Sequence, residues 1–411
     1  MARKLDVSLI PKGWKYDLLD KLAVRCSGHT PSKSHPEYWD GGIKWISLTD
    51  SHRLDKGYVY VTDKEISLEG IANSSAEIHP AETVVLSRDA GIGKSGVMAE
   101  SMAVSQHFIA WKCDNKEKLN SWFLYNWLQF NKAEFERQAV GSTIKTIGLP
   151  YFKKLKIAVP PYNEQEKIAL IFSTWDKAIT ITEQLLGNSQ KQKKALIMQL
   201  LTGKWKFQGN DSKWSHYLLS ELFDFKKGKG LSKGTLVRDG RKCILYGELY
   251  TKYGEVIKHV VSRTAENDGF SSKSGDILIP SSTTTTGVDL SNATAILEDR
   301  VLLGGDINVL RPKKNINSIF MAYLLTHIKK KDIASRAQGI TIIHLYGSDL
   351  KTIKVFIPDS LTEQEKIVSA LLTADNDIAI IKQKLHHLKQ EKKALMQQLL
   401  TGKRRVKTEW A

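Results

Sequence analysis

The sequence has 411 residues, which is enough for two or three domains, and a composition typical of folded proteins, with 41% hydrophobic and 26% charged residues. Its formal net charge of +17 is spread along the chain rather than gathered in a tail, which favours a polyanionic partner, most often a nucleic acid. No signal peptide precedes Trp14, no run of about 18 apolar residues predicts a membrane span, and three scattered cysteines predict neither a disulfide framework nor a metal site, so we expect a cytoplasmic protein.

The first 160 residues are predicted to form a domain of short strands and turns with one helix. Residues 43–49 and 83–87 have the composition of strands, and residues 122–136 have that of a helix. Two loops rich in small polar residues, 28–34 and 141–146, could place hydroxyl and amide groups against phosphates or base edges.

Two motifs in this domain resemble catalytic sequences but lack an essential residue. Residues 91–95 (Gly-Ile-Gly-Lys-Ser) resemble a phosphate-binding P-loop, which requires a glycine where this chain has Arg88. Residues 159–162 (Val-Pro-Pro-Tyr) resemble the Asn/Asp-Pro-Pro-Tyr motif of DNA amino-methyltransferases, but valine cannot accept a hydrogen bond from the amino group being methylated. We find no nuclease pattern and no histidine pair suited to a metal or nucleophile, so the sequence indicates a recognition module.

Residues 161–209 are predicted to form a long helix. Asn163 with Glu166 makes a capping-box pattern, prolines stand just before it, and Gly203 fits a left-handed C-terminal cap. Between these ends, apolar residues such as Ile168 and Phe172 recur at alternating steps of four and three, as in a coiled coil. Gly187 interrupts the pattern at a cost of about 1 kcal/mol relative to alanine and marks a point where the helix could kink.

A second domain is predicted over residues 210–358. Its strands include residues 276–280 and 307–311, and residues 319–336 form the counterpart of the first domain's helix. The polar loop 281–287 resembles the loops of the first domain in composition, and short basic runs lie at 226–229 and 329–331.

Residues 359–411 repeat residues 161–209 at a constant offset. Glu-Gln-Glu-Lys-Ile at 164–168 recurs at 363–367, an offset of 364 − 165 = 199, and Lys-Lys-Ala-Leu and Gln-Leu-Leu-Thr-Gly-Lys recur with the same spacing. A helix of 38 residues would span roughly 57 Å, which is too long to bury its apolar stripe against one small domain. The two long helices are therefore expected to pack against each other.

Over essentially its whole length, the chain resembles the specificity subunits of type I restriction-modification systems. The two Glu-Gln-Glu-Lys-Ile helices ending in Gln-Leu-Leu-Thr-Gly-Lys are the most specific part of the resemblance. Further matches are residues 28–32 (Gly-His-Thr-Pro-Ser), Tyr38-Trp39, residues 42–46 (Gly-Ile-Lys-Trp-Ile) and residues 275–279 (Gly-Asp-Ile-Leu-Ile). His29 departs from the glycine that is frequent at its position in the family.

The resemblance implies an α+β fold with two α/β target recognition domains, separated by two long helices packed as an antiparallel coiled coil in a pseudo-twofold internal duplication. The segments would be target recognition domain 1 (1–160), conserved spacer helix 1 (161–209), target recognition domain 2 (210–358) and conserved spacer helix 2 (359–411). Each domain would recognise one half of a bipartite target in double-stranded DNA. Two methyltransferase subunits and the restriction/translocase subunits would bind this non-catalytic scaffold, bringing S-adenosylmethionine, ATP and Mg²⁺.

The candidate DNA-binding residues are polar or basic and lie mainly in predicted loops. In the first domain they are Thr30, Ser32, Tyr38, Lys44, Arg88, Lys94, Ser142, Thr143 and Lys145. In the second domain they are Lys227, Lys229, Lys233, Tyr246, Ser281, Ser282, Thr283, Gln338 and Thr341. No catalytic or metal-binding residue is predicted.

Two other hypotheses remain at this stage. A coiled-coil scaffold that binds only proteins would bind its partners independently of salt, whereas DNA binding through phosphates weakens steeply with salt. A self-sufficient modification enzyme would transfer methyl groups alone, and Val159 argues against it.

Overall fold

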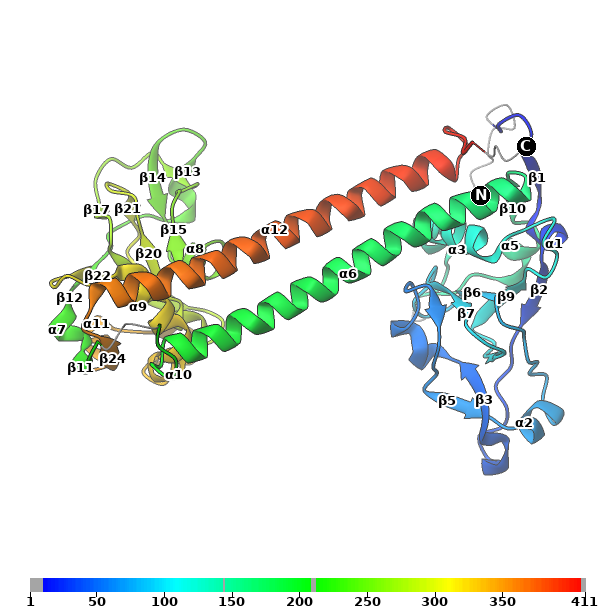
Figure 1. Cartoon of the computed structure of the whole chain (residues 1–411), viewed down its shortest axis with the longest axis horizontal. Coiled ribbons are helices and arrows are strands. Elements are labelled where there is room, and N and C mark those ends of the chain that lie inside the picture. Colours follow the sequence, from blue (N-terminus) through cyan, green and yellow to red (C-terminus); the bar gives the residue numbers. More distant parts are fainter. Residues whose placement is uncertain (1–9, 143–144, 208–211, 408–411) are drawn as a thin grey trace. The chain divides into compact units, whose positions relative to one another are not determined.

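The computed structural model describes residues 10–142, 145–207 and 212–407, which form two compact units. Unit 1 comprises residues 1–183 and 384–411, and unit 2 comprises residues 184–383. Each unit therefore contains one of the predicted domains together with the beginning of one long helix and the end of the other (Figure 1).

In the part of the chain that the structure describes, the domain of unit 1 contains three sheets, of which the largest has five strands. The smallest sheet closes the domain beside the long helix and consists of two antiparallel strands, β1 (Lys15–Leu18) and β10 (Lys156–Val159). The large sheet has the order β2-β9-β6-β7-β4, with bounds Val24–Ser27, Phe108–Lys112, Val84–Ser87, Ser95–Met98 and Tyr58–Val59. A three-stranded sheet has the order β5-β3-β8, with bounds Lys64–Ile66, Trp39–Ile46 and Ala103–Val104. The helices are α1 (Leu19–Leu22), α2 (Leu68–Ala72), α3 (Ser121–Phe130), α4 (Lys132–Gln138) and α5 (Leu149–Lys153).

The domain of unit 2 repeats this plan although its sequence differs. Strands β11 (Trp214–Leu218) and β24 (Lys354–Pro358) close it as β1 and β10 close the first. Its main sheet has the order β12-β22-β18-β20-β15, with bounds Phe223–Lys227, Ile307–Pro312, Ile277–Pro280, Thr294–Ile296 and Val256–Ile257. In both sheets the last pair is parallel and the others antiparallel, so the topology is the same.

The remaining elements of unit 2 are short. A second five-stranded sheet has the order β13-β16-β14-β21-β17, with bounds Leu236–Val237, Arg263–Thr264, Arg241–Ile244, Leu302–Leu303 and Phe270–Ser271. β19 (Ser282–Thr283) pairs with β23 (Ile343–His344). The helices are α7 (Leu219–Leu222), α8 (Glu248–Thr251), α9 (Ser318–Tyr323), α10 (Lys330–Ala334) and α11 (Gly347–Lys351).

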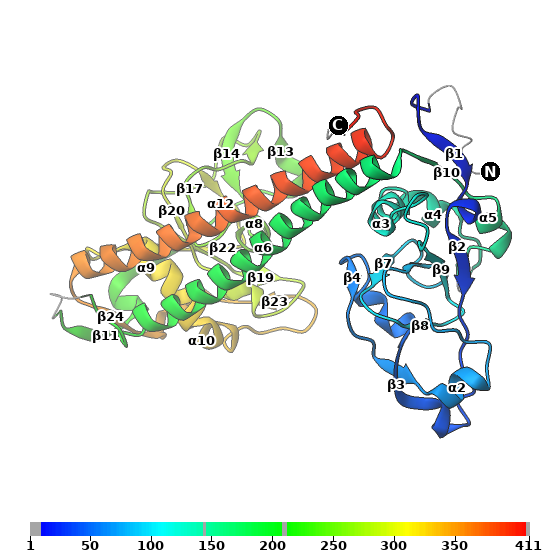
Figure 2. The same cartoon turned by 45° about the vertical axis from the view of Figure 1, so that its right-hand side comes forward.

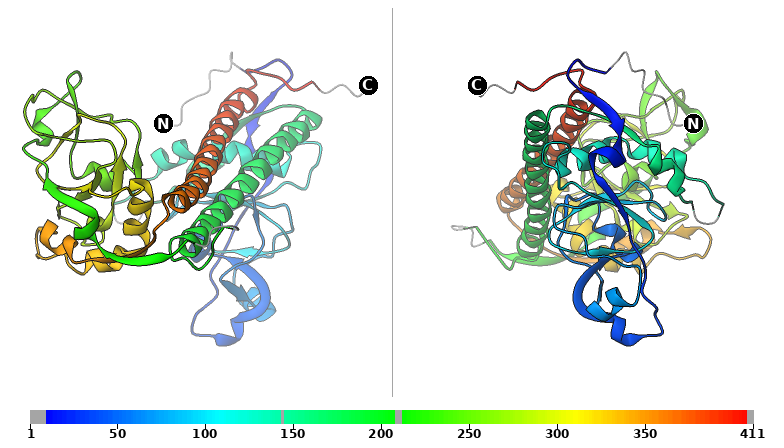
Figure 3. Two further views of the ribbon diagram at one scale, coloured as in Figure 1. Left: turned by 60° about the vertical axis from the view of Figure 1, so that its left-hand side comes forward. Right: turned by 90° about the vertical axis from the view of Figure 1, so that its right-hand side faces the viewer.

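The long helices are α6 (Tyr162–Leu200) and α12 (Leu361–Leu399), each of 39 residues. Within each unit they run side by side in opposite directions, as the views in Figures 1, 2 and 3 agree. The predicted apolar seam faces inward, since Ile168, Phe172, Ile367 and Leu371 are all buried. α6 continues through Gly187, so the helix is not broken there.

The ends of the helices differ slightly from the prediction. α6 begins at Tyr162, so Asn163 lies inside the helix rather than at its predicted cap position. α12 begins at Leu361, and the Ser360 hydroxyl accepts from the Glu363 amide and caps it. The predicted terminal caps are confirmed: Gly203 and Gly402 both have φ of +69°, the left-handed conformation that glycine adopts at low cost. Within the described residues, no helix is both long and apolar enough to cross a bilayer.

Each unit has its own core, to which both long helices contribute. In unit 1, Phe123 of α3 and Trp111 of β9 pack in one cluster with Phe172 of α6 and Leu399 of α12. In unit 2, Phe320 of α9 and Leu310 of β22 share a cluster with Leu200 of α6 and Leu371 of α12. The largest cluster of each domain is therefore completed by the helices, whereas other clusters, around Phe108 and around Val309, lie within the domains alone.

Candidate nucleic-acid interface

A repeated glutamine joins each domain to its long helix. The side-chain oxygen of Gln165 accepts from the Asn120 amide at 2.9 Å, while its amide group donates to the carbonyls of Lys118 and Pro160. Gln364 accepts from the Asn317 amide at 2.8 Å and donates to the Pro358 carbonyl at 2.9 Å. Both side chains are almost fully buried, so these bonds fix how each domain is held on the start of its helix.

Each unit gathers three loops around one turn, and we call this arrangement the loop cluster. In unit 1 the turn is residues 104–107, and the loops are residues 28–30, 88–89, and the described residues 140–142 and 145–146. In unit 2 the turn is residues 303–306, and the loops are residues 228–230, 281–283 and 338–344. The equivalent hydrogen bonds, described next, show that the two clusters correspond.

The first loop meets the turn through a glycine. The amides after Gly28 and Gly228 donate to the carbonyls of Val104 (3.1 Å) and Leu303 (2.9 Å), respectively. A Cβ atom on Gly28 would lie 1.8 Å from the Val104 oxygen, and one on Gly228 would lie 1.9 Å from the Gly304 oxygen. Only glycine lets the backbones approach this closely, which explains the glycine at both positions.

The second and third loops are attached in the same way in both units. The Arg88 amide donates to the His107 carbonyl at 3.0 Å, and the Ile147 amide donates to the Arg88 carbonyl at 2.9 Å. In unit 2 the Ser281 amide donates to the Asp306 carbonyl, and the Leu345 amide donates to the Ser281 carbonyl, both at 2.9 Å. The third loop therefore leaves and rejoins the body of each domain at equivalent points.

The third loop is closed by one pair of residues in each unit. Val140 pairs with Thr146, and Gln338 pairs with His344, each through two backbone hydrogen bonds. Gly141 and Gly339 open these loops with φ of +129° and +126°, which side-chain-bearing residues rarely adopt. In the third loop of unit 2, Ile340 is 99% exposed, an arrangement that places an apolar group in solvent beside polar ones.

Side chains reinforce the cluster of unit 1. The Asp89 carboxylate accepts from the Thr146 hydroxyl and hydrogen bonds with the His107 ring at 2.6 Å, so it ties the turn to the third loop. The Thr30 hydroxyl donates to Gln106 on the same turn. The Arg88 Nε atom is 3.7 Å from the Asp89 carboxylate and, within the described residues, has no hydrogen-bond partner.

The loop clusters unite many of the predicted DNA-binding residues. In unit 1 they bring together Thr30, Arg88, Ser142 and Lys145, and Thr143 lies outside the described residues. In unit 2 they bring together Lys229, Ser281, Ser282, Thr283, Gln338 and Thr341. Lys227 directly precedes this cluster and is exposed.

Some of the predicted DNA-binding residues in these clusters are less exposed to solvent than the loop composition indicates. Ser281, Ser282 and Thr283 are at most 6% exposed, because β19 pairs with β23 and covers them. The Thr283 hydroxyl is hydrogen bonded to that of Thr285 at 2.8 Å. Lys229 is exposed and pairs with Asp268 at 3.1 Å, a contact that a phosphate could replace.

Other predicted residues are held elsewhere in their domains. The Lys94 ammonium points inward and donates to the Ser51 carbonyl and hydroxyl, both at 3.0 Å, while Lys44 donates to the Tyr60 carbonyl at 2.6 Å. Tyr38 stacks on His35, with ring centroids 4.7 Å apart. The remaining three predicted DNA-binding residues lie near the surface of their domains: Ser32, Lys233 and Tyr246.

Sequence reasoning missed Asp89, His107, Ile340 and His344. A signal for the third loops was present, because Gly-x-Thr-Ile at 141–144 recurs at 339–342 with an offset of 198. The turns carried no such signal, since residues 104–107 and 303–306 share no residue.

Comparison with known proteins identifies the family to which the two repeated domains belong. The family model of the type I restriction modification DNA specificity domain matches twice, over residues 11–188 and 211–390. The chain belongs to this family. Each match begins near the first strand of a domain and ends within a long helix, so the family unit is a domain plus its helix.

Curated relatives of the family span nearly the same length. The specificity subunit of the type I restriction enzyme MjaVIII from Methanocaldococcus jannaschii is 26% identical over 86% of this chain and 87% of its own length. The MjaIX specificity subunit from the same organism is 23% identical over 98% of this chain and 96% of its own length.

Solved structures share the fold. The S subunit of a type I restriction-modification system from M. genitalium has a TM-score of 0.60 at 21% identity, covering 97% of this chain and 99% of its own. The HsdS subunit from Thermoanaerobacter tengcongensis has a TM-score of 0.51 at 16% identity, covering 96% and 98%. The expected fold class and family resemblance are thus confirmed.

Proposed function

We infer that this specificity-domain protein is the DNA sequence-recognition subunit of a type I restriction-modification system and is itself non-catalytic. The observation that carries the proposal is the double family match, joined to relatives named as type I specificity subunits. The net charge of +17 supplies the attraction to phosphates that such a role requires.

Each domain recognises one half of a bipartite site in double-stranded DNA, and its loop cluster supplies the contacts to base edges. The third loops support this role because backbone hydrogen bonds fix both ends of each loop, while Ser142 and Lys145 in unit 1 and Ile340 and Thr341 in unit 2 are exposed. Exposed Ile340 suits an apolar contact with a thymine methyl group, as aliphatic side chains make in the major groove. Different residues at equivalent positions would then recognise different half-sites.

The other subunits of the system assemble on this chain. Two methyltransferase subunits and the restriction/translocase subunits bind it in the cytoplasm, and they, rather than this chain, bind S-adenosylmethionine, ATP and Mg²⁺. The long helices set the distance between the two half-sites.

Methylation mapping of DNA from cells that express the chain with its methyltransferase subunit tests the proposal. The expected result is a bipartite motif with a fixed spacer, and a continuous motif would refute the two-domain assignment. DNA binding by the purified complex should also weaken by orders of magnitude between about 50 and 200 mM salt.

The role of the loop cluster is tested by Gly339→Ala. A Cβ atom there would lie 2.1 Å from the Ile342 carbonyl oxygen at a φ of +126°, so the third loop must rearrange. We expect specific binding to weaken by about tenfold to a hundredfold, as for a mismatched base pair. The control is Gly254→Ala, whose Cβ would meet no atom within 4 Å. Equal affinity of the two variants would exclude the third loop of unit 2 from recognition.

A further inference from the structure

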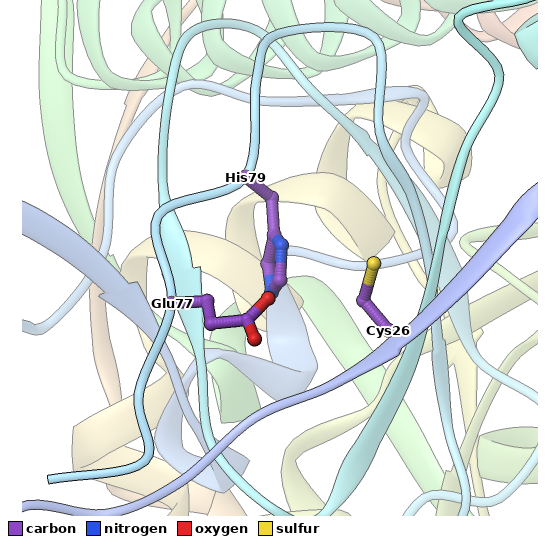
Figure 4. A group of neighbouring side chains, drawn as sticks. All are labelled: Cys26, Glu77 and His79. Atoms are coloured by element: carbon purple, nitrogen blue, oxygen red, sulfur yellow. The ribbon is translucent and has the colours of Figure 1, made fainter.

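Three potential metal ligands, none of them a residue of the loop cluster, converge in the domain of unit 1 (Figure 4). They are the thiol of Cys26 on β2, the carboxylate of Glu77 and the imidazole of His79, whose ligand atoms all lie within 4.8 Å of one another. Among the residues that the structure describes, no other three Cys, His, Asp or Glu side chains meet this closely.

His79 is the unusual member of the group. Its side chain is fully buried, yet neither ring nitrogen has a hydrogen-bond partner within the described part of the chain. The backbone is fixed, because His79 and Met102 exchange two hydrogen bonds of 2.8 and 2.9 Å. A buried polar group without a partner is costly, which indicates that the imidazole has a ligand.

Burial affects the protonation of the two buried ligands in opposite ways. Burial lowers the pKa of His79, so the ring is neutral at pH 7 and offers a lone pair. Burial raises the pKa of the Cys26 thiol, the charge of Glu77 adds to this and Lys112 partly offsets it, so the thiolate is disfavoured unless a cation binds it. Glu77 is exposed and gives the site an opening to solvent.

We propose that Cys26, Glu77 and His79 bind one divalent transition-metal ion of the zinc class. A sulfur, an imidazole nitrogen and a carboxylate oxygen are the ligands that Zn²⁺ takes, and a water molecule completes a tetrahedral site. Binding releases the thiol proton to solvent, so the thiolate and carboxylate together balance the two charges of the ion.

The ion would brace the first recognition domain. β2 leads directly into Gly28 and the first loop of the cluster, whereas Glu77 and His79 lie on the segment between α2 and β6. A shared ion would cross-link these segments. Its role would be structural, which distinguishes it from the ions that the partner subunits bind. No ligand spacing along the chain indicates the site, since Cys26 lies 51 positions before Glu77 (77 − 26 = 51).

The test is titration of the full, chelator-stripped, reduced chain with Co²⁺, a spectroscopic substitute for Zn²⁺. We expect one ion per chain and a sulfur-to-cobalt charge-transfer band. Cys26→Ser should lose the band, while Cys113→Ser, which changes the other cysteine of the same domain, should keep it. No band in the unmodified chain, or a band that persists in Cys26→Ser, would overturn the proposal.

If Cys26→Ser fails to fold, a second variant tests the proposed metal site. Glu77→Gln changes an exposed side chain, and we expect it to weaken Co²⁺ binding at least tenfold while leaving the circular dichroism spectrum unchanged. Unchanged Co²⁺ affinity in Glu77→Gln would overturn the three-ligand site. Excess Zn²⁺ should also raise the melting temperature of the Cys113→Ser control but not that of Cys26→Ser. None of these measurements involves DNA, so they are independent of the proposed function.

Discussion

At the scale of single residues, the repeated Glu-Gln-Glu-Lys-Ile motif has a structural explanation. Its glutamine, Gln165 or Gln364, bonds the start of a helix to a domain. The glutamate before it is also buried: Glu164 pairs with Arg405 at 2.7 Å, while Glu363 accepts from the Trp214 indole at 3.1 Å. Buried polar side chains with fixed partners tolerate little change, so these positions stay alike while the domains diverge.

Gln165→Ala should lower the free energy of unfolding by about 1–3 kcal/mol, because three backbone groups lose their partner at a largely buried site. Urea denaturation followed by circular dichroism measures the change. Gln184→Ala, on an exposed position of the same helix, should change stability by no more than about 0.5 kcal/mol. A similar effect of both variants would contradict the joining role of Gln165.

Glu255 gives a pH-dependent prediction. Burial alone would raise its pKa, but the hydrogen bond with His327, of 2.6 Å, and the charge of Lys193 lower the pKa below the usual 4.5. A lowered carboxyl pKa stabilises the fold above the unfolded-state pKa, and this stabilisation is lost as the pH falls through the folded-state pKa. Glu255→Gln should therefore destabilise the chain at pH 7, and the difference from wild type should shrink below about pH 4.5.

Denaturation curves at several pH values measure that difference. The control is Glu266→Gln, which changes an exposed glutamate of the same unit and should follow the wild type throughout. A deficit in Glu255→Gln that stayed constant down to pH 3 would show that the charge of Glu255 contributes nothing.

At the scale of elements, the two helices are joined by reciprocal ion pairs. In unit 1, Lys392 of α12 pairs with Asp176 of α6 at 2.5 Å, and in unit 2, Lys193 of α6 pairs with Asp375 of α12. Because 392 − 193 and 375 − 176 both equal 199, each pair is the repeat of the other with the helices exchanged. In unit 2, the Tyr323 hydroxyl of the domain also donates a hydrogen bond to Asp375.

Lys392→Asp should destabilise unit 1 by placing two carboxylates together, and adding Asp176→Lys should restore most of the loss. The lysine is largely buried but the aspartate is 42% exposed, so the coupling energy should be only about 0.5–1 kcal/mol. A double-mutant cycle by thermal denaturation measures it. Lys393→Asp, at the exposed neighbouring position, is the control and should show no rescue by Asp176→Lys.

The elements were predictable where they carry local signals. The long helices were foreseen because their apolar seam and terminal glycines are local patterns, and the strands near 84, 277 and 307 were foreseen from apolar runs. The predicted helix over 122–136 is in fact two helices, because the side chain of Asn131 bonds back to the Trp127 carbonyl and α3 ends there. Likewise, residues 319–336 form α9 and α10 joined by a π-helical segment over Leu324–Ile328.

The loop cluster was only partly predictable, for a physical reason. Its hydrogen bonds join residues far apart in sequence, such as Arg88 to Ile147, and no local pattern encodes them. The composition of a loop indicates polar groups but not their direction, so it could not show that Lys94 points inward or that Ser282 is covered by β23.

At the scale of the whole molecule, each unit is completed by distant parts of the chain. In unit 1, Arg405 from the C-terminal segment bonds the buried Glu164 and the Lys12 carbonyl, and a Cβ on Gly402 would meet Pro11 at 2.2 Å. In unit 2, Gly203 takes the corresponding place against Trp214, where a Cβ atom would lie 3.3 Å from the indole ring. The junctions between domains and helices are thus equivalent, whereas the residues of the two loop clusters differ.

Equivalent junctions predict that the domains can be exchanged. We expect a chain in which residues 14–159 replace residues 214–358 to fold, because β1 and β10 can close the domain as β11 and β24 do and Asn120 can meet Gln364 as Asn317 does. With its methyltransferase subunit, this chain should direct methylation to a motif made of two copies of the same half-site. Methylation mapping beside the unaltered chain measures this. A motif that still contained the second domain's half-site would show that recognition resides outside residues 214–358, since these are the only residues that were replaced.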